Sequence, residues 1–126
     1  MKSLRVVIAI LTLVIFGISA GHAESKKPTQ EALQKSYEHQ TKGNIADDAG
    51  KIDEAIKEYK EALTYDPEDT NTLFNLGTVY LKVNNAVDAV EVFEQVVKID
   101  TKDTQAYNLL GLAYRGSGRV QDAIKI

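Results

Sequence analysis

The stretch TLFNLGTVYLKVNNAVDAVEVFEQVVKID, residues Thr72–Asp100, contains a glycine, Gly77, in the middle of a segment that otherwise reads as a helix. The apolar residues around it keep the three-to-four spacing of a helix, as Leu73, Leu76 and Tyr80 show. A glycine inside a helix costs about 1 kcal/mol relative to alanine, because it loses more backbone entropy on folding than any other residue. Close packing at Gly77 must therefore offset that cost.

Gly77 belongs to a pattern that recurs every 34 residues, since Gly43 and Gly111 lie at that distance on either side. Several other positions keep the same frame: Ala55, Ala89 and Ala123; Glu54, Asp88 and Asp122; Tyr80 and Tyr114; Tyr59 and Phe93; Asp66 and Asp100. A repeat of this length predicts units that cannot bury their own apolar face and therefore stack on their neighbours. Glycine in the first helix and alanine in the second predict closely approaching antiparallel helices, in which each buried large side chain contributes about 1.5–3 kcal/mol.

The rest of the chain predicts helices joined by short turns. The expected helices cover residues 29–48, 53–65, 70–83, 86–99, 104–115 and 120–126, with turns at 49–50 and 116–119. Thr29 is placed to cap the first helix, and Asp69 or Thr70 and Asp103 or Thr104 are placed to cap later ones. No segment alternates with period two between turn signals, so the chain is expected to be all-α.

The repeated frame resembles the tetratricopeptide repeat, a motif of about 34 residues that folds as two helices. The signature positions of the second unit are filled by Leu73, Leu76, Gly77, Tyr80, Ala89 and Phe93. The first unit departs from the signature at His39, Lys42 and Ala46, where the family has large apolar residues. The resemblance implies a solenoid of antiparallel helix pairs, about two full repeats plus a truncated third. Its parts are a lead-in at 24–35, full repeats at 36–69 and 70–103, and an incomplete repeat at 104–126.

In this family the first helices of successive repeats line a concave groove that holds an extended peptide or a partner helix. The resemblance places these residues in the groove as partner-binding residues: Asn44, Asn71, Phe74, Asn75, Thr78, Leu81, Asn108, Leu112 and Arg115. Tyr37, Gln40, Asp47, Lys82 and Gln105 also fall at groove positions. Apolar pockets with amide groups between them suit an extended segment, with Phe74 and Asn75 as the expected anchors. The alternative is that Leu81 and Leu112 pack within the stack and that the asparagines are only solvated.

Some members of the family clamp the C-terminal carboxylate of a peptide with lysines, an arginine and two asparagines. Asn44 and Asn75 occupy the two asparagine positions in this sequence. Gln40, Gln105 and Leu109 stand where the cations would be, so a carboxylate would lose the charge-assisted hydrogen bonds that make such a clamp strong. This form of recognition is therefore not expected here.

The N-terminus has the layout of a secretory signal peptide. Two basic residues precede an apolar run over residues 6–18, and the small residues Gly21 and Ala23 suit cleavage before Glu24. The run is shorter than the roughly 20 apolar residues of a membrane-spanning helix, which favours cleavage over retention. The signal peptide, residues 1–23, predicts an exported, periplasmic protein; an inner-membrane anchor formed by the same residues is the alternative.

Composition narrows the range of functions. The 126 residues carry a net charge of −3, and without residues 1–23 thirteen basic residues face eighteen acidic ones. A mildly acidic chain without a basic stripe is not expected to bind nucleic acid or an anionic membrane surface. No cysteine is present, and His39, the only histidine after residue 23, is expected to face the next helix. No grouping of acid, base and nucleophile suggests a reaction, so no enzymatic activity, metal or cofactor is expected.

Together these features predict a non-catalytic scaffold of the bacterial cell envelope that binds a partner peptide or helix. The last expected helix is short, so Tyr107, Leu110 and Tyr114 are expected to be only partly covered. Two alternatives follow from this end of the sequence. The chain is the N-terminal fragment of a larger exported repeat protein, or its uncapped C-terminal face joins a second copy as a self-assembling structural module.

Overall fold

The computed structural model describes residues 26–126, and the predicted signal peptide lies outside them. The described residues form six helices: α1 (Gln30–Asp48), α2 (Ile52–Tyr65), α3 (Thr70–Lys82), α4 (Ala86–Ile99), α5 (Thr104–Gly116) and α6 (Val120–Lys125). No strand occurs between residues 26 and 126, and each helix begins and ends within one residue of its predicted limits. The all-α class predicted from the sequence is confirmed.

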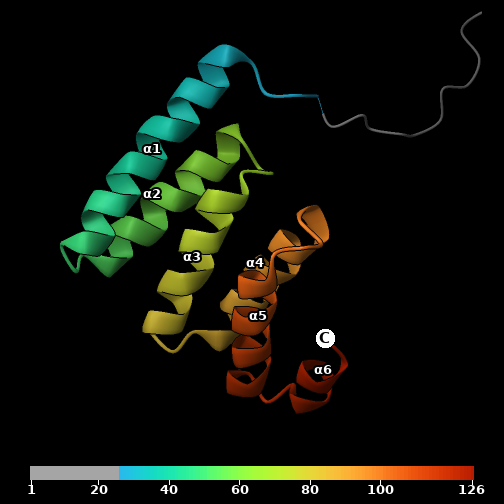
Figure 1. Ribbon diagram of the computed structural model, residues 1–126. Helices are drawn as coiled ribbons and strands as arrows, with labels where there is room; N and C mark the ends of the chain where they lie inside the picture. The colour runs from blue at the N-terminus through green and yellow to red at the C-terminus, as the bar shows by residue number, and fades with distance from the viewer. Residues whose placement is uncertain (1–25) are drawn as a thin grey trace, which may run out of the picture.

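The helices stack as antiparallel pairs in chain order. Each helix packs on the one before it, and α3 also contacts both α1 and α5. As a result α1, α3 and α5 run in the same direction and lie next to one another as the first helices of successive pairs (Figure 1). This is the helix-pair solenoid that the repeat frame predicts.

Local hydrogen bonds explain where the helices begin. Thr29 Oγ1 accepts from the N–H of Ala32 at 3.1 Å, and Asp103 Oδ1 accepts from the N–H of Ala106 at 2.9 Å. The carboxylate of Asp69 caps α3 in the same manner, so the aspartates rather than the adjacent threonines are the N-caps.

The turns inside the three helix pairs share one backbone feature. Gly50, Asn84 and Gly118 have φ values of 72°, 57° and 80°, and they lie 34 residues apart. Glycine adopts this left-handed conformation without steric cost, and asparagine is among the few other residues that tolerate it. The two glycine turns were predicted from the sequence, whereas the turn at Asn84 was not.

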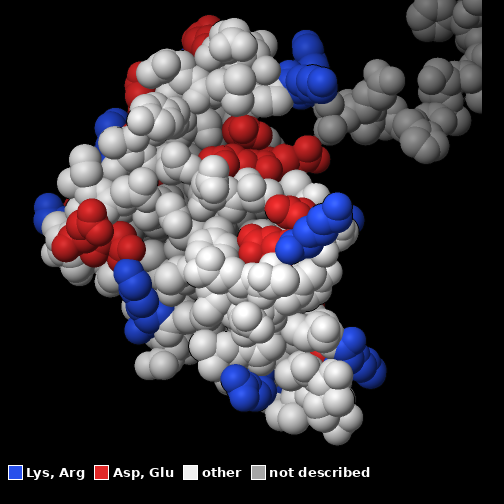
Figure 2. Space-filling model, in the orientation of Figure 1, with Lys and Arg blue, Asp and Glu red and all other residues white. Residues whose placement is uncertain are grey.

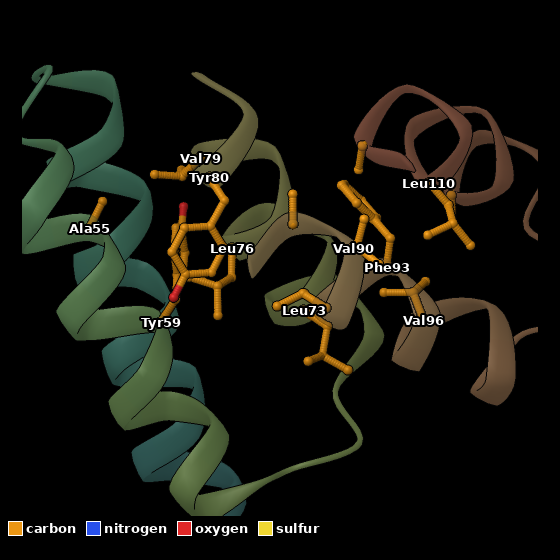
Figure 3. Packing of buried hydrophobic residues seen from close by; sticks show 14 of the residues in the cluster. Ala55, Tyr59, Leu73, Leu76, Val79, Tyr80, Val90, Phe93, Val96 and Leu110 are labelled. Carbon is orange, nitrogen blue, oxygen red and sulfur yellow. The ribbon is translucent and has the colours of Figure 1, made fainter. Parts of the chain in front are cut away.

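The packing of aromatic rings in the core explains the glycines at positions 43 and 77. Figure 3 shows Tyr59 and Phe93 among the buried residues of that core. A Cβ at Gly77 would lie 2.8 Å from two ring carbons of Phe93, and one at Gly43 would lie 2.6 Å from the ring of Tyr59. Both rings are almost fully buried. An aromatic ring of the second helix fills the space above each of these two glycines, and Ala55 and Ala89 of the second helices are fully buried. The close approach of the two helices predicted from the glycines and alanines is therefore present in these pairs.

The solenoid begins with a polar helix face. Lys42 of α1 is exposed, whereas Leu76 and Leu110, at 34-residue intervals from it, are only 3% and 1% exposed. Among the described residues no helix precedes α1 to cover this face, so a charged side chain costs nothing there. His39 faces α2 as predicted, because its Nδ1 lies 2.7 Å from Glu58 Oε2 and its ring stacks on Tyr65.

At the C-terminal end of the solenoid, two residues are more buried than the sequence predicted. Leu110 and Tyr114 are buried rather than partly covered, because α4 packs against α5 and shields them. The hydroxyl of Tyr114 donates to Glu94 at 2.8 Å, and the guanidinium of Arg119 lies 4.7 Å from the centre of its ring. Exposed apolar side chains at this end include Val120 and Ile124 of α6, and Ile124 is 73% exposed.

Candidate functional site

The predicted partner-binding residues all lie on the first helices of the three pairs. Asn44 belongs to α1; Asn71, Phe74, Asn75, Thr78 and Leu81 belong to α3; and Asn108, Leu112 and Arg115 belong to α5. On each helix three side chains at positions i, i+4 and i+7 form a stripe. The stripes are Gln40, Asn44 and Asp47 on α1; Phe74, Thr78 and Leu81 on α3; and Asn108, Leu112 and Arg115 on α5.

The α1 stripe is tied to α3 by side-chain hydrogen bonds at its N-terminal end. Gln40 Nε2 donates to Asp69 Oδ2 at 2.9 Å and to Thr72 Oγ1 at 2.7 Å. Thr72 is fully buried, and its hydroxyl in turn donates to Asp69. The first level of contact between the two helices is therefore a closed polar network.

The middle level is centred on the side-chain oxygen of Asn44. This oxygen accepts from the hydroxyl of Tyr59 at 2.8 Å and from Nδ2 of Asn75 at 3.1 Å. The Tyr59 ring is 1% exposed, and burial, with a further contribution from the nearby Asp47 carboxylate, raises the pKa of Tyr59 to about 12. Asn44 therefore satisfies a buried hydroxyl as well as joining α1 to α3.

The third level is an ion pair near the C-terminal ends of both helices. Lys82 Nζ lies 2.7 Å from both carboxylate oxygens of Asp47. The three levels together constitute a polar ladder between α1 and α3, made of Gln40, Asn44, Asp47, Asp69, Thr72, Asn75 and Lys82. Most of the polar groups that the α1 stripe offers are thus used inside the protein.

The junction of α3 and α5 has the same register and different chemistry. The residues 34 positions after Gln40, Asn44 and Asp47 are Phe74, Thr78 and Leu81. Their expected neighbours on α5, 34 positions after Thr72, Asn75 and Lys82, are Ala106, Leu109 and Gly116. No side-chain hydrogen bond or ion pair joins α3 to α5 in the described part of the chain. We call Phe74, Thr78, Leu81, Asn108, Leu112 and Arg115 the α3–α5 face.

Phe74 has a structural contact as well as an accessible side. Its ring meets that of Phe93 edge to face, with 5.7 Å between the ring centres. Phe74 and Leu81 are partly buried against the core, and Thr78 Oγ1 donates to the backbone carbonyl of Phe74 at 2.9 Å. Leu112 is 46% exposed, so its side chain does not pack within the stack as the alternative interpretation supposed.

Arg115 is the charged member of the α3–α5 face. Its side chain is exposed and forms no ion pair with any residue between 26 and 126. Together with Asn108 it also borders a hollow of about 430 Å³ between α5 and α6, whose other walls include Gly111, Val120 and Ile124. This part of the surface thus combines a cation, an amide and apolar side chains.

Metal ligands and membrane spans are two further features that residues 26–126 could carry. No three His, Asp or Glu side chains of this region are grouped as ligands for a metal ion. None of its helices has the length and apolar character needed to cross a bilayer.

Sequence reasoning missed the role of the polar ladder. It placed Gln40, Asp47 and Lys82 at groove positions, yet the structure pairs all three with neighbours inside the protein. Partners across the ladder are separated by 29, 31, 32 or 35 residues. A search for complementary polar residues close to one repeat length apart would have found them.

Comparison with known proteins identifies the family. The tetratricopeptide repeat profile matches residues 48–113, slightly more than half of the chain. The chain belongs to the tetratricopeptide repeat family, as its sequence frame and helix pairs indicate.

Three relatives show the kinds of protein that it resembles. It is 31% identical over 98 residues to small glutamine-rich tetratricopeptide repeat-containing protein 2 of Mycosarcoma maydis, covering 78% of this chain and 28% of that protein. It is 33% identical over 100 residues to the Hsp70-Hsp90 organising protein of Plasmodium falciparum, covering 68% of this chain and 16% of that one. Among solved structures, the first repeat domain of Spaghetti (RPAP3) bound to the HSP90 peptide SRMEEVD is 27% identical, with a TM-score of 0.68 and 74% of each chain covered. The chain thus spans less than a third of these two curated relatives.

Proposed function

We propose that this protein is a non-catalytic adaptor that binds an extended segment of a partner protein along the surface formed by α1, α3 and α5. The observation that carries the proposal is the α3–α5 face, where Leu112, Asn108 and Arg115 of α5 are exposed and Phe74 and Leu81 of the neighbouring helix α3 are partly buried. Apolar contacts with amide groups between them suit a peptide whose backbone needs hydrogen bonds. The related repeat domain of RPAP3, which was solved with a bound peptide, supports the same mode of use.

The bound segment is expected to differ from the peptide of that relative. The RPAP3 peptide, SRMEEVD, carries two glutamates and ends in an aspartate. The positions at which the family holds a terminal carboxylate with cations are Gln40, Gln105 and Leu109 here, and Gln40 is already bonded to Asp69 and Thr72. We therefore expect this protein to bind a different class of segment from an HSP90 tail.

Crosslinking in the native cell tests the adaptor function. A photoreactive amino acid at position 108 on α5 is expected to form a covalent product with a partner polypeptide, because Asn108 is exposed on the α3–α5 face. The same amino acid at position 57 is the control, since Lys57 is exposed on the second helix α2. Identical products from both positions, or no product from position 108, would contradict the adaptor function.

We further propose that the adaptor acts in the bacterial cell envelope, after export and cleavage of residues 1–23. The support is the sequence pattern of basic residues, apolar run and small residues before Glu24. The intact mass of the protein isolated from cell fractions tests this location. A periplasmic species that begins at Glu24 is expected; a species that retains residues 1–23 in the membrane fraction would favour the anchored form.

Self-association through the α5–α6 end is a second candidate function. The observation that favours it is the exposure of three apolar side chains, Val120, Ile124 and Ile126, beside the hollow. Sedimentation at increasing protein concentration separates the two functions. A constant monomer mass is expected of the adaptor, whereas a mass that rises with concentration would support the self-assembling module.

A further inference from the structure

The polar ladder and the α3–α5 face differ in what they leave available to a partner. Gln40 and Asp47 of the α1 stripe are bonded to α3, and the oxygen of Asn44 accepts from two donors. The α3–α5 face has no corresponding bonds, so burying its apolar side chains under a ligand breaks no internal hydrogen bond between helices. Docking on this half of the surface therefore has the lower desolvation cost.

Charge is distributed unevenly along α3 and α5. Neither helix contains an acidic residue, although the chain as a whole is acidic. Each carries one basic residue, and both lie in the last turn: Lys82 on α3 and Arg115 on α5. Lys82 is neutralised by Asp47, whereas Arg115 has no acidic partner among the described residues, so Arg115 is the cation available to a ligand.

The other end of the same two helices is acidic. Acidic side chains outnumber basic ones in the connections that precede α3 and α5 (Figure 2), where Lys102 is accompanied by five acids: Asp66, Glu68, Asp69, Asp100 and Asp103. An acidic group of a ligand is repelled from these connections and attracted to the end of α5, where Arg115 lies. The distribution of charge on the α3–α5 face thus determines which part of a bound segment can carry an acidic residue: the part that lies at Arg115.

We propose that the α3–α5 face docks an extended partner segment with apolar side chains on Phe74, Leu81 and Leu112 and with an aspartate or glutamate side chain paired to Arg115. The proposal rests on the adaptor function and specifies its partner by chemistry. The negative charge that pairs with Arg115 belongs to a side chain of the ligand and not to its C-terminus. The reason is that the family positions that hold a terminal carboxylate carry no cation in this chain. The hollow beside Asn108 and Arg115 gives room for an apolar side chain next to the acid.

Selection from a library of random linear peptides, displayed between flexible linkers so that no terminus is free, tests the proposal. The wild-type protein is expected to enrich peptides that combine apolar residues with one acid. The most enriched sequence is then synthesised with an acetylated N-terminus and an amidated C-terminus, and its affinity is measured by fluorescence anisotropy. Replacing its acid by the corresponding amide is expected to weaken binding about tenfold, the usual effect of losing a charge-assisted hydrogen bond.

Two protein variants assign that effect to one residue. Arg115→Gln is expected to bind the acid and amide peptides equally, and Lys82→Gln, which removes the neighbouring paired cation, is expected to keep the preference. Circular dichroism checks that both variants remain folded. A preference that survives Arg115→Gln would overturn the proposal, and so would enrichment of peptides without an acid.

The remaining outcomes separate this inference from the adaptor function. If the amide peptide regains affinity when its C-terminus is left as a free carboxylate, the side-chain source is wrong. Peptides that bind without any preference for an acid would refute the Arg115 pairing and leave the adaptor function standing. A library that yields no binder would count against this docking mode, and crosslinking from position 108 would then decide the adaptor function by itself.

Discussion

The junctions α1–α3 and α3–α5 share one backbone register and differ in their side chains. At α1–α3 three levels of contact are polar and internally bonded, whereas at α3–α5 the equivalent positions hold Phe74, Thr78, Leu81 and their apolar neighbours. Buried residues of the repeat, such as Gly77 and Phe93, set the spacing between the helices. The side chains of the stripes on α1, α3 and α5 do not set the spacing of the helices. The α1–α3 junction can therefore stabilise the stack while the α3–α5 junction remains available to a partner.

The largest expected effect concerns the glycine that spaces the helices. Gly77→Leu is expected to lower the free energy of unfolding by about 3 kcal/mol, because even a Cβ there would lie 2.8 Å from the Phe93 ring. Urea unfolding measures the change. Gly111→Leu is the matched control, since a Cβ at Gly111 meets only Ile126 Cδ1, at 3.7 Å. Equal losses from the two variants would refute the packing role of the ring.

Alkaline pH is expected to weaken the fold through two buried tyrosines. Burial raises the pKa of Tyr59 to about 12, and burial together with the hydrogen bond to Glu94 raises the pKa of Tyr114 to about 12. Unfolded tyrosine has a pKa of about 10, so between about pH 10 and pH 12 the unfolded chain releases protons that the folded chain retains. The free energy of unfolding therefore falls as pH rises, by at most about 2.7 kcal/mol for each group.

Tyrosine-to-phenylalanine variants show which tyrosine causes the loss of stability at alkaline pH. Tyr59→Phe is expected to unfold with a shallower pH dependence above pH 10, whereas Tyr37→Phe, at a site that is 64% exposed, is expected to behave as the wild type. Chemical unfolding at a series of pH values gives both slopes. If Tyr59→Phe and the wild type keep the same slope, the buried Tyr59 hydroxyl is not the origin of the loss.

Removing the middle level of the polar ladder is expected to cause a smaller loss of stability. Asn44→Ala is expected to cost about 1–2 kcal/mol, because it leaves the buried hydroxyl of Tyr59 without its acceptor. Asn108→Ala removes an exposed amide of α5 and is expected to change stability by less than about 0.5 kcal/mol. Thermal unfolding of the two variants side by side measures the difference, and a costlier Asn108→Ala would reverse the assignment of roles.

The smallest expected effect is that of the ion pair. Lys82→Met is expected to cost about 0.2–1 kcal/mol at low salt and less at high salt, because the Lys82 side chain is 48% exposed and the pair with Asp47 is screened. Arg115→Met is expected to leave stability unchanged, since it breaks no ion pair. Unfolding in low-salt and high-salt buffers gives the comparison. A salt-dependent loss on Arg115→Met would reveal an internal partner for Arg115.

Local signals allowed most of the fold to be predicted. Caps such as Thr29 and the glycine turns at Gly50 and Gly118 depend on residues within one helical turn, so the helix limits could be read from the sequence. The contacts between helices were harder to predict. The sequence predicted close helix approach at the glycines, but it did not show that an aromatic ring fills the space above Gly77, because spacing along the chain does not give the depth of a side chain in the stack.

The candidate site was only partly predictable for a related reason. The family resemblance places Asn44 and Asn75 on the same surface, yet it does not indicate that they bond to each other and to Tyr59. The availability of Arg115 depends on the absence of acids from α3 and α5, which becomes meaningful only once the two helices are known to be neighbours.

The most direct test of the division between the two junctions is an NMR titration of the ¹⁵N-labelled protein with the peptide that the library enriches most. The resonances of the Asn108 side-chain amide and the Leu112 backbone amide are expected to shift on binding, while those of the Asn44 side-chain amide are unchanged because Tyr59 and Asn75 donate to its carbonyl oxygen. Shifts confined to Gln40 and Asn44, with Leu112 unchanged, would contradict this expectation and move the binding surface to α1.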